Sequence, residues 1–160
     1  MTRPPLTIID RLRAGVTTAS AGETRALAAG FAAALPADAT VALHGDLGAG
    51  KTTFVQGLAR GLGITDPVTS PTFNIFTLHR GPTNLLHLDA YRLDRPRQVD
   101  DLLLEDFMIS PWCLAVEWPE KIAGWLPPGA LHLELGIYRD QRHTLRLIQP
   151  VQPGGAPPRH

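Results

Sequence analysis

The stretch that decides the fold reads TVALHGDLGAGKT, from Thr40 to Thr52. Residues 40–44 form a short apolar run typical of a strand, and residues 45–52 fit the P-loop pattern G-x-x-x-x-G-K-[ST]. With glycine at ~7% of residues, this pattern arises by chance in well under ~1% of chains of this length. In such a loop the glycines turn backbone N–H groups inward and the following helix adds its N-terminal dipole, so an anion is bound without side chains. The stretch therefore predicts a site for a nucleoside triphosphate.

Side chains at the end of the motif add charge and metal ligation to this backbone cradle. Lys51 supplies a positive charge for the β- and γ-phosphates, and the Thr52 hydroxyl is a hard oxygen ligand suited to Mg²⁺. The residues expected to contact the nucleotide here are Gly45, Asp46, Leu47, Gly48, Ala49, Gly50, Lys51, Thr52 and Thr53.

Helical and strand patterns alternate around this motif. A capping-box pair, Ser20 and Glu23, opens a helix that Pro36 ends, and a second helix runs from Lys51 to about Gly63. Further elements are expected as strands at 72–78, 85–88, 113–116, 130–135 and 144–148, and as a short helix at 99–107. The order predicts an α/β fold: a single P-loop NTPase-like domain with a mostly parallel sheet flanked by helices, a C-terminal strand pair, and a ligand at the carboxyl ends of the strands.

Composition and the two ends of the chain indicate one globular domain. The chain has 160 residues, of which 44% are hydrophobic and 19% charged, and this is enough to bury a core without staples. Residues 16–149 are expected to form the domain and residues 1–15 an N-terminal extension of uncertain order. Residues 150–160, rich in proline and glycine, are expected to form a disordered tail.

Charge and cysteine content limit the environments and partners to consider. The formal net charge is +0, whereas a protein that binds RNA or DNA by itself usually carries a basic excess. Any contact with nucleic acid is therefore expected to be shared with a partner. The single cysteine, Cys113, excludes an intramolecular disulfide, and the sequence shows neither a signal-peptide pattern nor an apolar run near the ~20 residues of a membrane helix. These features predict a cytoplasmic protein with no membrane partner.

Two acidic residues come directly after apolar strand patterns. Asp89 follows residues 85–88, and an acid in this place downstream of a P-loop typically supports Mg²⁺, although a solvated strand-end acid has the same appearance. Glu117 follows residues 113–116 and could orient an attacking water or complete the metal shell, with a salt-bridged loop acid as the equal alternative. The candidate catalytic residues are thus Lys51, Asp89 and Glu117, and the candidate metal ligands are Thr52, Asp89 and Glu117.

Four sequence blocks in this order resemble a known family. They are GDLGAGKTTF at 45–54, SPTF at 70–73, HLDAYRL at 87–93 and VEWPE at 116–120. Together they make the chain, from about residue 20 to residue 147, similar to TsaE, a family of small ATPases in the bacterial tRNA threonylcarbamoyladenosine pathway. A P-loop alone is shared by many families, whereas these four blocks in so short a chain are much more specific.

The resemblance implies an activity, partners and residue roles. Members of the family bind ATP and Mg²⁺ and act with the TsaB–TsaD pair, which transfers a threonylcarbamoyl group to the adenosine beside the anticodon, so tRNA is contacted only through the complex. Hydrolysis, weak in the small subunit alone, resets that complex rather than driving the transfer. By motif position, Thr52, Asp89 and Glu117 would surround Mg²⁺. Ser70 and Thr72 would lie in a switch-like loop near the γ-phosphate, and Trp118 beside the catalytic acid or at the partner surface.

Three further positions extend or qualify the resemblance. Ser20 aligns with the segment that approaches the adenine, although helix capping alone explains it better. Arg142 aligns with a region of nucleotide contact, with a solvated hairpin arginine as the equal alternative. Leu103 stands where glycine is common in the family, and this difference puts in question the local turn and part of a partner surface, but not the nucleotide site.

Other P-loop functions compete with this interpretation. A small-molecule kinase is the main rival, because Arg92, Arg95 and Arg97 could form a lid that clamps phosphates, although a solvated loop explains them more simply. A GTPase is disfavoured because the sequence has no Asn-Lys-x-Asp segment to recognise guanine. A module that holds ATP as a structural switch differs from an ATPase only in the fate of the γ-phosphate.

Overall fold

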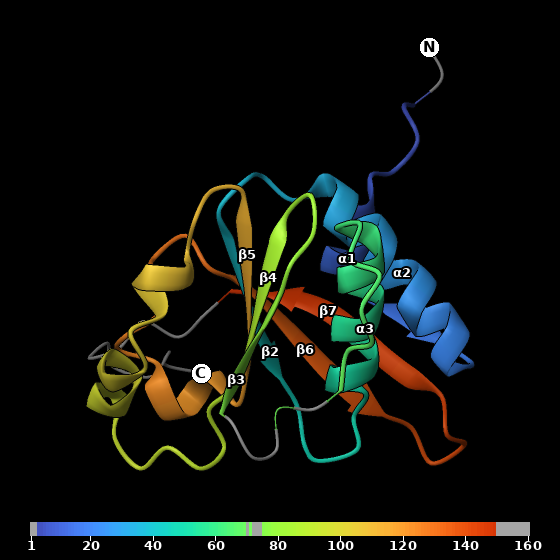
Figure 1. Cartoon of the computed structure of the whole chain (residues 1–160). Helices are drawn as coiled ribbons and strands as arrows, with labels where there is room; N and C mark the ends of the chain where they lie inside the picture. The colour runs from blue at the N-terminus through green and yellow to red at the C-terminus, as the bar shows by residue number, and fades with distance from the viewer. Residues whose placement is uncertain (1–2, 70, 72–74, 150–160) are drawn as a thin grey trace.

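The structure, a computed structural model, describes residues 3–69, 71 and 75–149. In this part of the chain a seven-stranded sheet has the order β1-β7-β6-β2-β5-β4-β3 (Figure 1). The strands are β1 (Val16–Thr18), β2 (Ala39–His44), β3 (Phe76–His79), β4 (Asn84–Asp89), β5 (Trp112–Glu117), β6 (Leu131–Ile137) and β7 (His143–Ile148). The α-helices are α1 (Ile8–Ala14), α2 (Ala21–Ala34) and α3 (Lys51–Gly61). Three 3-10 helices are η1 (Pro96–Leu102), η2 (Leu104–Phe107) and η3 (Pro119–Ile122). The expected α/β domain is confirmed.

The sheet is parallel in its centre and antiparallel at both edges. Strands β6, β2, β5 and β4 run parallel to one another, while β3 pairs antiparallel with β4. The expected C-terminal strand pair is confirmed as β6 and β7, which pair antiparallel. Strand β1 adds to β7 at the other edge and was not predicted, because three residues are too few to show an alternating pattern.

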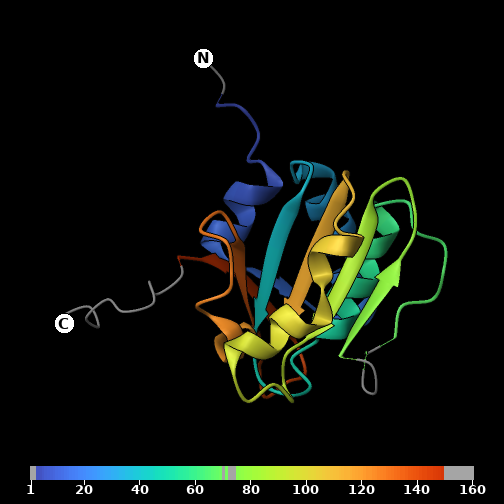
Figure 2. The same cartoon turned by 60° about the vertical axis from the view of Figure 1, so that its left-hand side comes forward.

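The two faces of the sheet are covered differently. Helices α1, α2 and α3 cover one face, and the 3-10 helices lie across the other, as the turned view shows (Figure 2). Because strand side chains alternate, Leu85 of β4 packs in the core under the α-helices, whereas Leu86 packs in the second core with Val99 and Ile122. Each face of the sheet therefore has its own hydrophobic cluster.

Helix α2 begins as predicted and packs closely on α3. The Ser20 hydroxyl accepts a hydrogen bond from the Glu23 N–H at 3.1 Å, which satisfies one of the helix's first donors. The Glu23 carboxylate accepts from the Ala19 N–H at 2.6 Å, one residue earlier than a capping box requires. On α3, a Cβ at Gly57 would collide with the Arg25 carbonyl of α2, so the glycine sets the close approach of the two helices.

The N-terminal segment contains a helix that the sequence analysis did not predict. Helix α1 is capped by Thr7, whose hydroxyl accepts from the Asp10 N–H at 3.1 Å, and its Leu12 is fully buried in the core. The predicted tail at 150–160 and the start of the predicted 72–78 strand lie outside the described residues, and β3 begins at Phe76. No helix in the described part of the chain is long and apolar enough to cross a membrane.

The short helix predicted at 99–107 is replaced by two shorter 3-10 helices rather than one continuous helix. Two 3-10 helices, η1 and η2, meet there at Leu103, which has φ 53° and ψ 44°. This left-handed conformation ends one helix and starts the next, and it crowds the Cβ of an L-residue against the following carbonyl oxygen. The position thus keeps the backbone that glycine would favour, even though its side chain is leucine.

Replacing Leu103 with glycine should stabilise the protein by about 1 kcal/mol, because relief of the left-handed strain exceeds the entropy that glycine adds to the unfolded chain. The Leu103 side chain is 57% exposed, so little burial is lost. The melting temperature should rise by about 2–4 °C. The control Asp101→Gly, at an exposed η1 residue, should lower it. Equal losses in both variants would contradict the strain at Leu103.

Candidate functional site

The glycine-rich loop, residues 45–50, joins β2 to α3 with a tight reversal of the chain. Gly45, Gly48 and Gly50 have φ of 149°, 84° and 97°, and glycine adopts the left-handed values of this range without strain. A Cβ at Gly45 would lie 2.5 Å from the Leu135 carbonyl oxygen of β6, so only glycine fits there. Gly50 is the N-cap of α3 and no side chain caps the helix. The first N–H groups of α3 are therefore directed at the loop without a side-chain acceptor.

Strand β7 contacts the base of this loop through His143. His143 Nδ1 lies 3.0 Å from the Ala49 carbonyl oxygen, and a Cβ at Gly50 would lie 3.3 Å from the same nitrogen. Ala49 is buried, whereas Asp46, Leu47 and Gly48 at the tip of the loop are exposed. The C-terminal strand pair thus fixes the base of the loop and leaves its tip open. No local sequence pattern predicts this role of His143, because its neighbour in the loop is 94 residues away.

Lys51 is buried and directed back along the loop. Its Nζ donates to the Gly45 carbonyl oxygen at 2.6 Å and lies 3.6 Å from the centroid of the Trp118 ring. Burial lowers the pKa of the Lys51 ammonium, and the negative charge of Glu117 opposes this shift. Within the described residues the ammonium thus has one hydrogen-bond acceptor, a backbone carbonyl, together with an aromatic face and nearby carboxylates.

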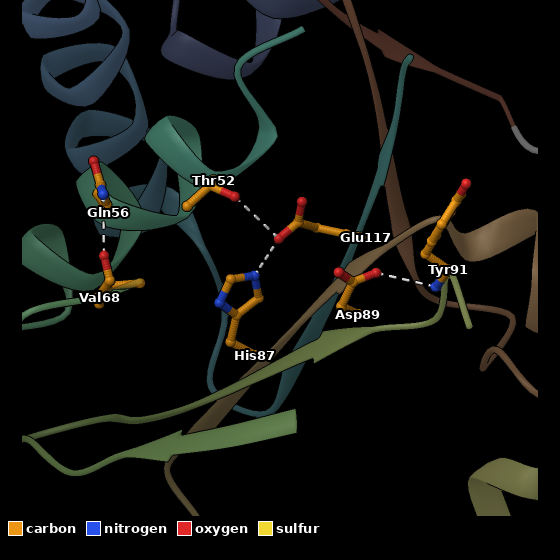
Figure 3. A network of polar contacts seen from close by, with 7 residues as sticks. All are labelled: Thr52, Gln56, Val68, His87, Asp89, Tyr91 and Glu117. Atoms are coloured by element: carbon orange, nitrogen blue, oxygen red, sulfur yellow. Dashed lines mark hydrogen bonds and ion pairs between the residues drawn. The ribbon is translucent and has the colours of Figure 1, made fainter. Parts of the chain in front are cut away.

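Asp89 and Glu117 lie side by side at the carboxyl edge of the sheet. They are register partners in the parallel pair β4–β5, and Glu117 is also the partner of Leu43, close to the start of the loop. Glu117 is 5% exposed, and Asp89 is half-buried with its Oδ1 accepting from the Tyr91 N–H at 3.0 Å (Figure 3). Burial raises the pKa of Asp89, and the neighbouring charge of Glu117 raises it further. A cation placed beside this pair would favour the charged forms of both carboxylates.

Thr52 and His87 contact the same oxygen of Glu117. The Thr52 hydroxyl donates to Glu117 Oε2 at 3.5 Å, and His87 Nε2 lies 2.5 Å from that atom (Figure 3). Thr52 comes from α3, His87 from β4 and Glu117 from β5, so three elements converge here. His87 was not among the predicted site residues. The sequence signal that could have found it is a polar residue within the apolar run 85–88.

Trp118 follows Glu117 in a strained backbone conformation. It has φ 57° and ψ 51° and is the N-cap of η3. Its ring packs against Tyr91 with 5.0 Å between centroids, on the segment that follows Asp89, and carries Lys51 on its face. The turn thereby brings the indole over the P-loop lysine, which connects the loop to an exposed aromatic side chain, Tyr91.

The remaining predicted residues are placed less centrally. Ser20 caps α2, near the end of β1, where Thr18 is the register partner of His143. Arg142 is exposed in the β6–β7 turn, with Nε 2.7 Å from Asp140 Oδ2. Thr53 is half-buried in the first turn of α3. Ser70 and Thr72, the predicted switch residues, lie outside the described residues. The three arginines considered for a phosphate-clamping lid are all exposed. Arg92 and Arg95 lie between β4 and η1, and Arg97 lies in the first turn of η1.

Within the described residues, no group of three or more His, Cys, Asp or Glu side chains could hold a metal ion. The site offers instead two carboxylates and one hydroxyl. Mg²⁺ in nucleotide sites is typically held by one or two carboxylates together with phosphate oxygens and water, and a P-loop threonine adds a hydroxyl oxygen. Thr52, Asp89 and Glu117 therefore fit a magnesium–nucleotide complex better than a metal bound by protein alone.

Comparison with known proteins gives a family match over most of the chain. Residues 18–146 match the family model described as "Threonylcarbamoyl adenosine biosynthesis protein TsaE". A protein of Nostoc sp. named tRNA threonylcarbamoyladenosine biosynthesis protein TsaE is 47% identical over 93 residues, which are 55% of this chain and 57% of that protein. The match therefore spans little more than half the length of the Nostoc relative.

Two further relatives extend the match in sequence and in structure. A Bacillus subtilis protein with the same name is 42% identical over 118 residues, 72% of this chain and 73% of that protein. A crystal structure of Bacillus subtilis YdiB superposes with a TM-score of 0.70 at 33% identity, covering 83% of this chain and 82% of that one. The fold is thus shared with an experimental structure.

Addition of MgATP should change the fluorescence of Trp118, because the phosphates would draw the Lys51 ammonium away from the indole. Emission titrations should show a saturable change that Trp118→Phe removes. Trp112 and Trp125 stay in that variant as internal references. Trp125→Phe is the matched control and should keep the change. A response that persists in Trp118→Phe would show that the lysine–indole contact does not report on nucleotide.

Proposed function

This chain belongs to the TsaE family, and on that premise we propose that it is a Mg²⁺-dependent ATP-binding and ATP-hydrolysing subunit required for the formation of threonylcarbamoyladenosine in tRNA. The names of its relatives support the pathway. The geometry of the site supports the nucleotide chemistry, and the two lines of support are independent. The proposed reaction is hydrolysis of the β–γ phosphoanhydride bond by water.

One observation carries the nucleotide part of the proposal: the uncapped N-terminus of α3 follows three positive-φ glycines and bears the buried Lys51. Backbone N–H groups and the helix dipole favour a phosphate at this place. Lys51 has a desolvated charge, which interacts more strongly with an anion than a hydrated one does. A triphosphate would satisfy donors that the described protein atoms leave without a side-chain acceptor.

The second part of the proposal assigns the oxygen side chains. Thr52, Asp89 and Glu117 would hold Mg²⁺ beside the terminal phosphates, where the ion supplies Lewis-acid stabilisation of the charge that develops on the phosphoryl oxygens. Asp89 fits a role through water because it lies at the half-exposed end of β4. Glu117, buried and next to Thr52, fits the role of the carboxylate that orients the attacking water.

Less central residues complete the proposed nucleotide contacts. Ser20, beside the β1–β7 edge that supports the loop, would approach the adenine, and Arg142 would reach the nucleotide only by leaving Asp140. Ser70 and Thr72 would act as the switch that senses the γ-phosphate. These assignments follow the family motifs.

The proposed partners are the TsaB–TsaD pair, with tRNA contacted only through the complex. The formal net charge of +0 supports an indirect contact, because binding to phosphodiesters is driven by basic side chains. Trp118 and the exposed Tyr91 offer an aromatic surface next to the site, of the kind enriched at protein interfaces. Since the pathway acts on tRNA, the proposal places the protein in the cytoplasm.

The test of this proposal is phosphate release from MgATP with and without TsaB–TsaD. Wild type should be slow alone and markedly faster with the pair, and Glu117→Gln should bind ATP normally but hydrolyse it about 10²–10⁴-fold more slowly, because an amide cannot act as a general base. Trp118→Ala should reduce the stimulation more than the affinity. A fast isolated enzyme that ignores both partner and Glu117→Gln would overturn the proposal. Transfer of phosphate to a metabolite would support the small-molecule kinase alternative.

Asp89→Asn should separate function from stability. The amide keeps the acceptor for the Tyr91 N–H but removes a charge that burial disfavours, so the nucleotide-free protein should melt at a higher temperature. The Mg²⁺ concentration for half-maximal hydrolysis should rise by about 10–100-fold. Calorimetry and a Mg²⁺ titration check the two effects. Asp94→Asn, at an exposed residue of the same segment, should change neither. A variant less stable than wild type would disprove the electrostatic cost at Asp89.

A further inference from the structure

His87 is a buried polar residue that the proposed mechanism does not yet use. Its side chain is 0% exposed and lies on β4, where Leu85, Leu86 and Leu88 form hydrophobic cores on both faces of the sheet. The alternation of strand side chains places His87 on the same face as Asp89, below α3. Burying an imidazole costs free energy unless its nitrogens are hydrogen-bonded, so the site must gain something from its presence.

Among the described residues, the one hydrogen bond of this imidazole is directed at the candidate catalytic acid. His87 Nε2 lies 2.5 Å from Glu117 Oε2, while Nδ1 is buried without a hydrogen-bond partner among the described residues (Figure 3). A proton on Nδ1 would therefore be buried with no acceptor, and such a donor costs about 1–3 kcal/mol. The favoured tautomer carries its proton on Nε2 and donates it to the carboxylate. The assignment rests on geometry, since among the described residues Nε2 has an acceptor and Nδ1 has none.

Only one of the two carboxylate oxygens of Glu117 accepts hydrogen bonds from the described residues. In residues 3–69, 71 and 75–149, both hydrogen bonds to the carboxylate, from His87 and from Thr52, go to Oε2. Oε1 is left for other partners. The short bond to His87 comes from a ring held rigidly in a β-strand, whereas the Thr52 bond is at the long limit of 3.5 Å. His87 thus contributes most of the restraint on the carboxylate.

We propose that His87 is a positioning residue for Glu117: its Nε2–H holds Oε2 and fixes the rotation of the carboxylate, so that Oε1 faces the attacking water. This inference rests on the proposed function of Glu117. A buried glutamate has three side-chain torsions, and correct placement of a catalytic group within a fraction of an ångström is a large part of its effect. Supporting residues of this kind typically contribute about 10–100-fold to activity.

A purely structural role for His87 predicts different behaviour. If the ring only filled space in the core, leucine at this position would be tolerated or stabilising, because removal of a buried imidazole also removes its unpaired Nδ1. The effect on hydrolysis would then follow stability alone. If His87 acts by hydrogen bonding, hydrolysis should instead recover when a side chain of similar length with a hydrogen-bond donor replaces it. Glutamine places an amide N–H near the position of Nε2.

The first measurement needs no nucleotide. In protein labelled with ¹⁵N-histidine, we expect His87 to show the Nε2–H tautomer and a downfield proton resonance protected from exchange. That resonance should disappear in Glu117→Ala, while the signals of the other five histidines stay in place. An Nδ1–H tautomer, or a resonance that Glu117→Ala leaves unchanged, would overturn the inference. This result stands whether or not the protein hydrolyses ATP, so it separates a failure here from a failure of the proposed function.

The second measurement is the rate of phosphate release by the full chain with TsaB–TsaD, together with ATP affinity from titration. His87→Leu should lower kcat by about 10–100-fold with the ATP dissociation constant within about twofold. His87→Gln should recover most of the loss. Should the leucine variant fail to fold, the glutamine variant and the resonance experiment still decide the question.

The matched control is His79→Leu. His79 is a buried histidine on the adjacent strand β3, also with an unpartnered Nε2, and it makes no hydrogen bond to Glu117 in the described structure. This variant should keep the wild-type kcat. Loss of activity in His79→Leu equal to that in His87→Leu, or a glutamine variant as slow as the leucine variant, would assign His87 to packing alone and overturn the inference.

Discussion

The parallel register of β2, β5 and β4 is the constraint on which the site depends. It pairs Leu43 with Glu117 and Glu117 with Asp89, so the start of the glycine-rich loop and the two carboxylates are brought to one edge of the sheet. A slip of one residue in β4 or β5 would turn its acid to the opposite face, among the aliphatic side chains of the second core. The large aliphatic residues on both faces therefore do more than stabilise the fold, because the burial of Leu86 and Leu114 on one side and Leu85 and Cys113 on the other excludes the shifted registers.

The site is built at some cost to stability. A buried ammonium at the start of α3, a half-buried carboxylate at the end of β4 whose charge burial disfavours, and the positive φ of Trp118 after β5 all lie at this edge. Positive φ also occurs at Asp38, Ile75, Leu103 and Gln141, whereas the aliphatic cores on both faces of the sheet and the capped α2 follow the ordinary rules. A strained residue beside ionisable groups whose charged forms burial disfavours is typical of a functional site, because a ligand can add favourable partners.

The sequence predicted what depends on local patterns and missed what depends on contacts between distant segments. The loop glycines, the Ser20 cap and the β6–β7 pair each have a signature within a few residues. The contacts of His143 with Ala49 and of His87 with Glu117 join residues 94 and 30 positions apart, and no local pattern encodes them. Strand β1 is too short to show a period, and it is specified by its antiparallel partner β7. The aliphatic spacing at 99–107 predicted one helix, and the segment instead forms two 3-10 helices because Leu103 adopts a left-handed conformation between them.

The contact between Lys51 and Trp118 gives the proposed partner effect a physical route. In the described structure the lysine contacts the Gly45 carbonyl and the indole, so a bound phosphate would compete with these contacts for the charge. A ligand shifts the equilibrium between the two positions of Lys51 only by its difference in affinity for them.

Trp118 also packs on Tyr91, which is 56% exposed and therefore accessible to another protein. A partner that bound Tyr91 with a preference for one position of the indole would change the availability of Lys51 without contacting the nucleotide. Because Trp118 adjoins Glu117 in the chain, the same movement would act on the carboxylate that His87 holds in place, so phosphate binding and hydrolysis would respond together.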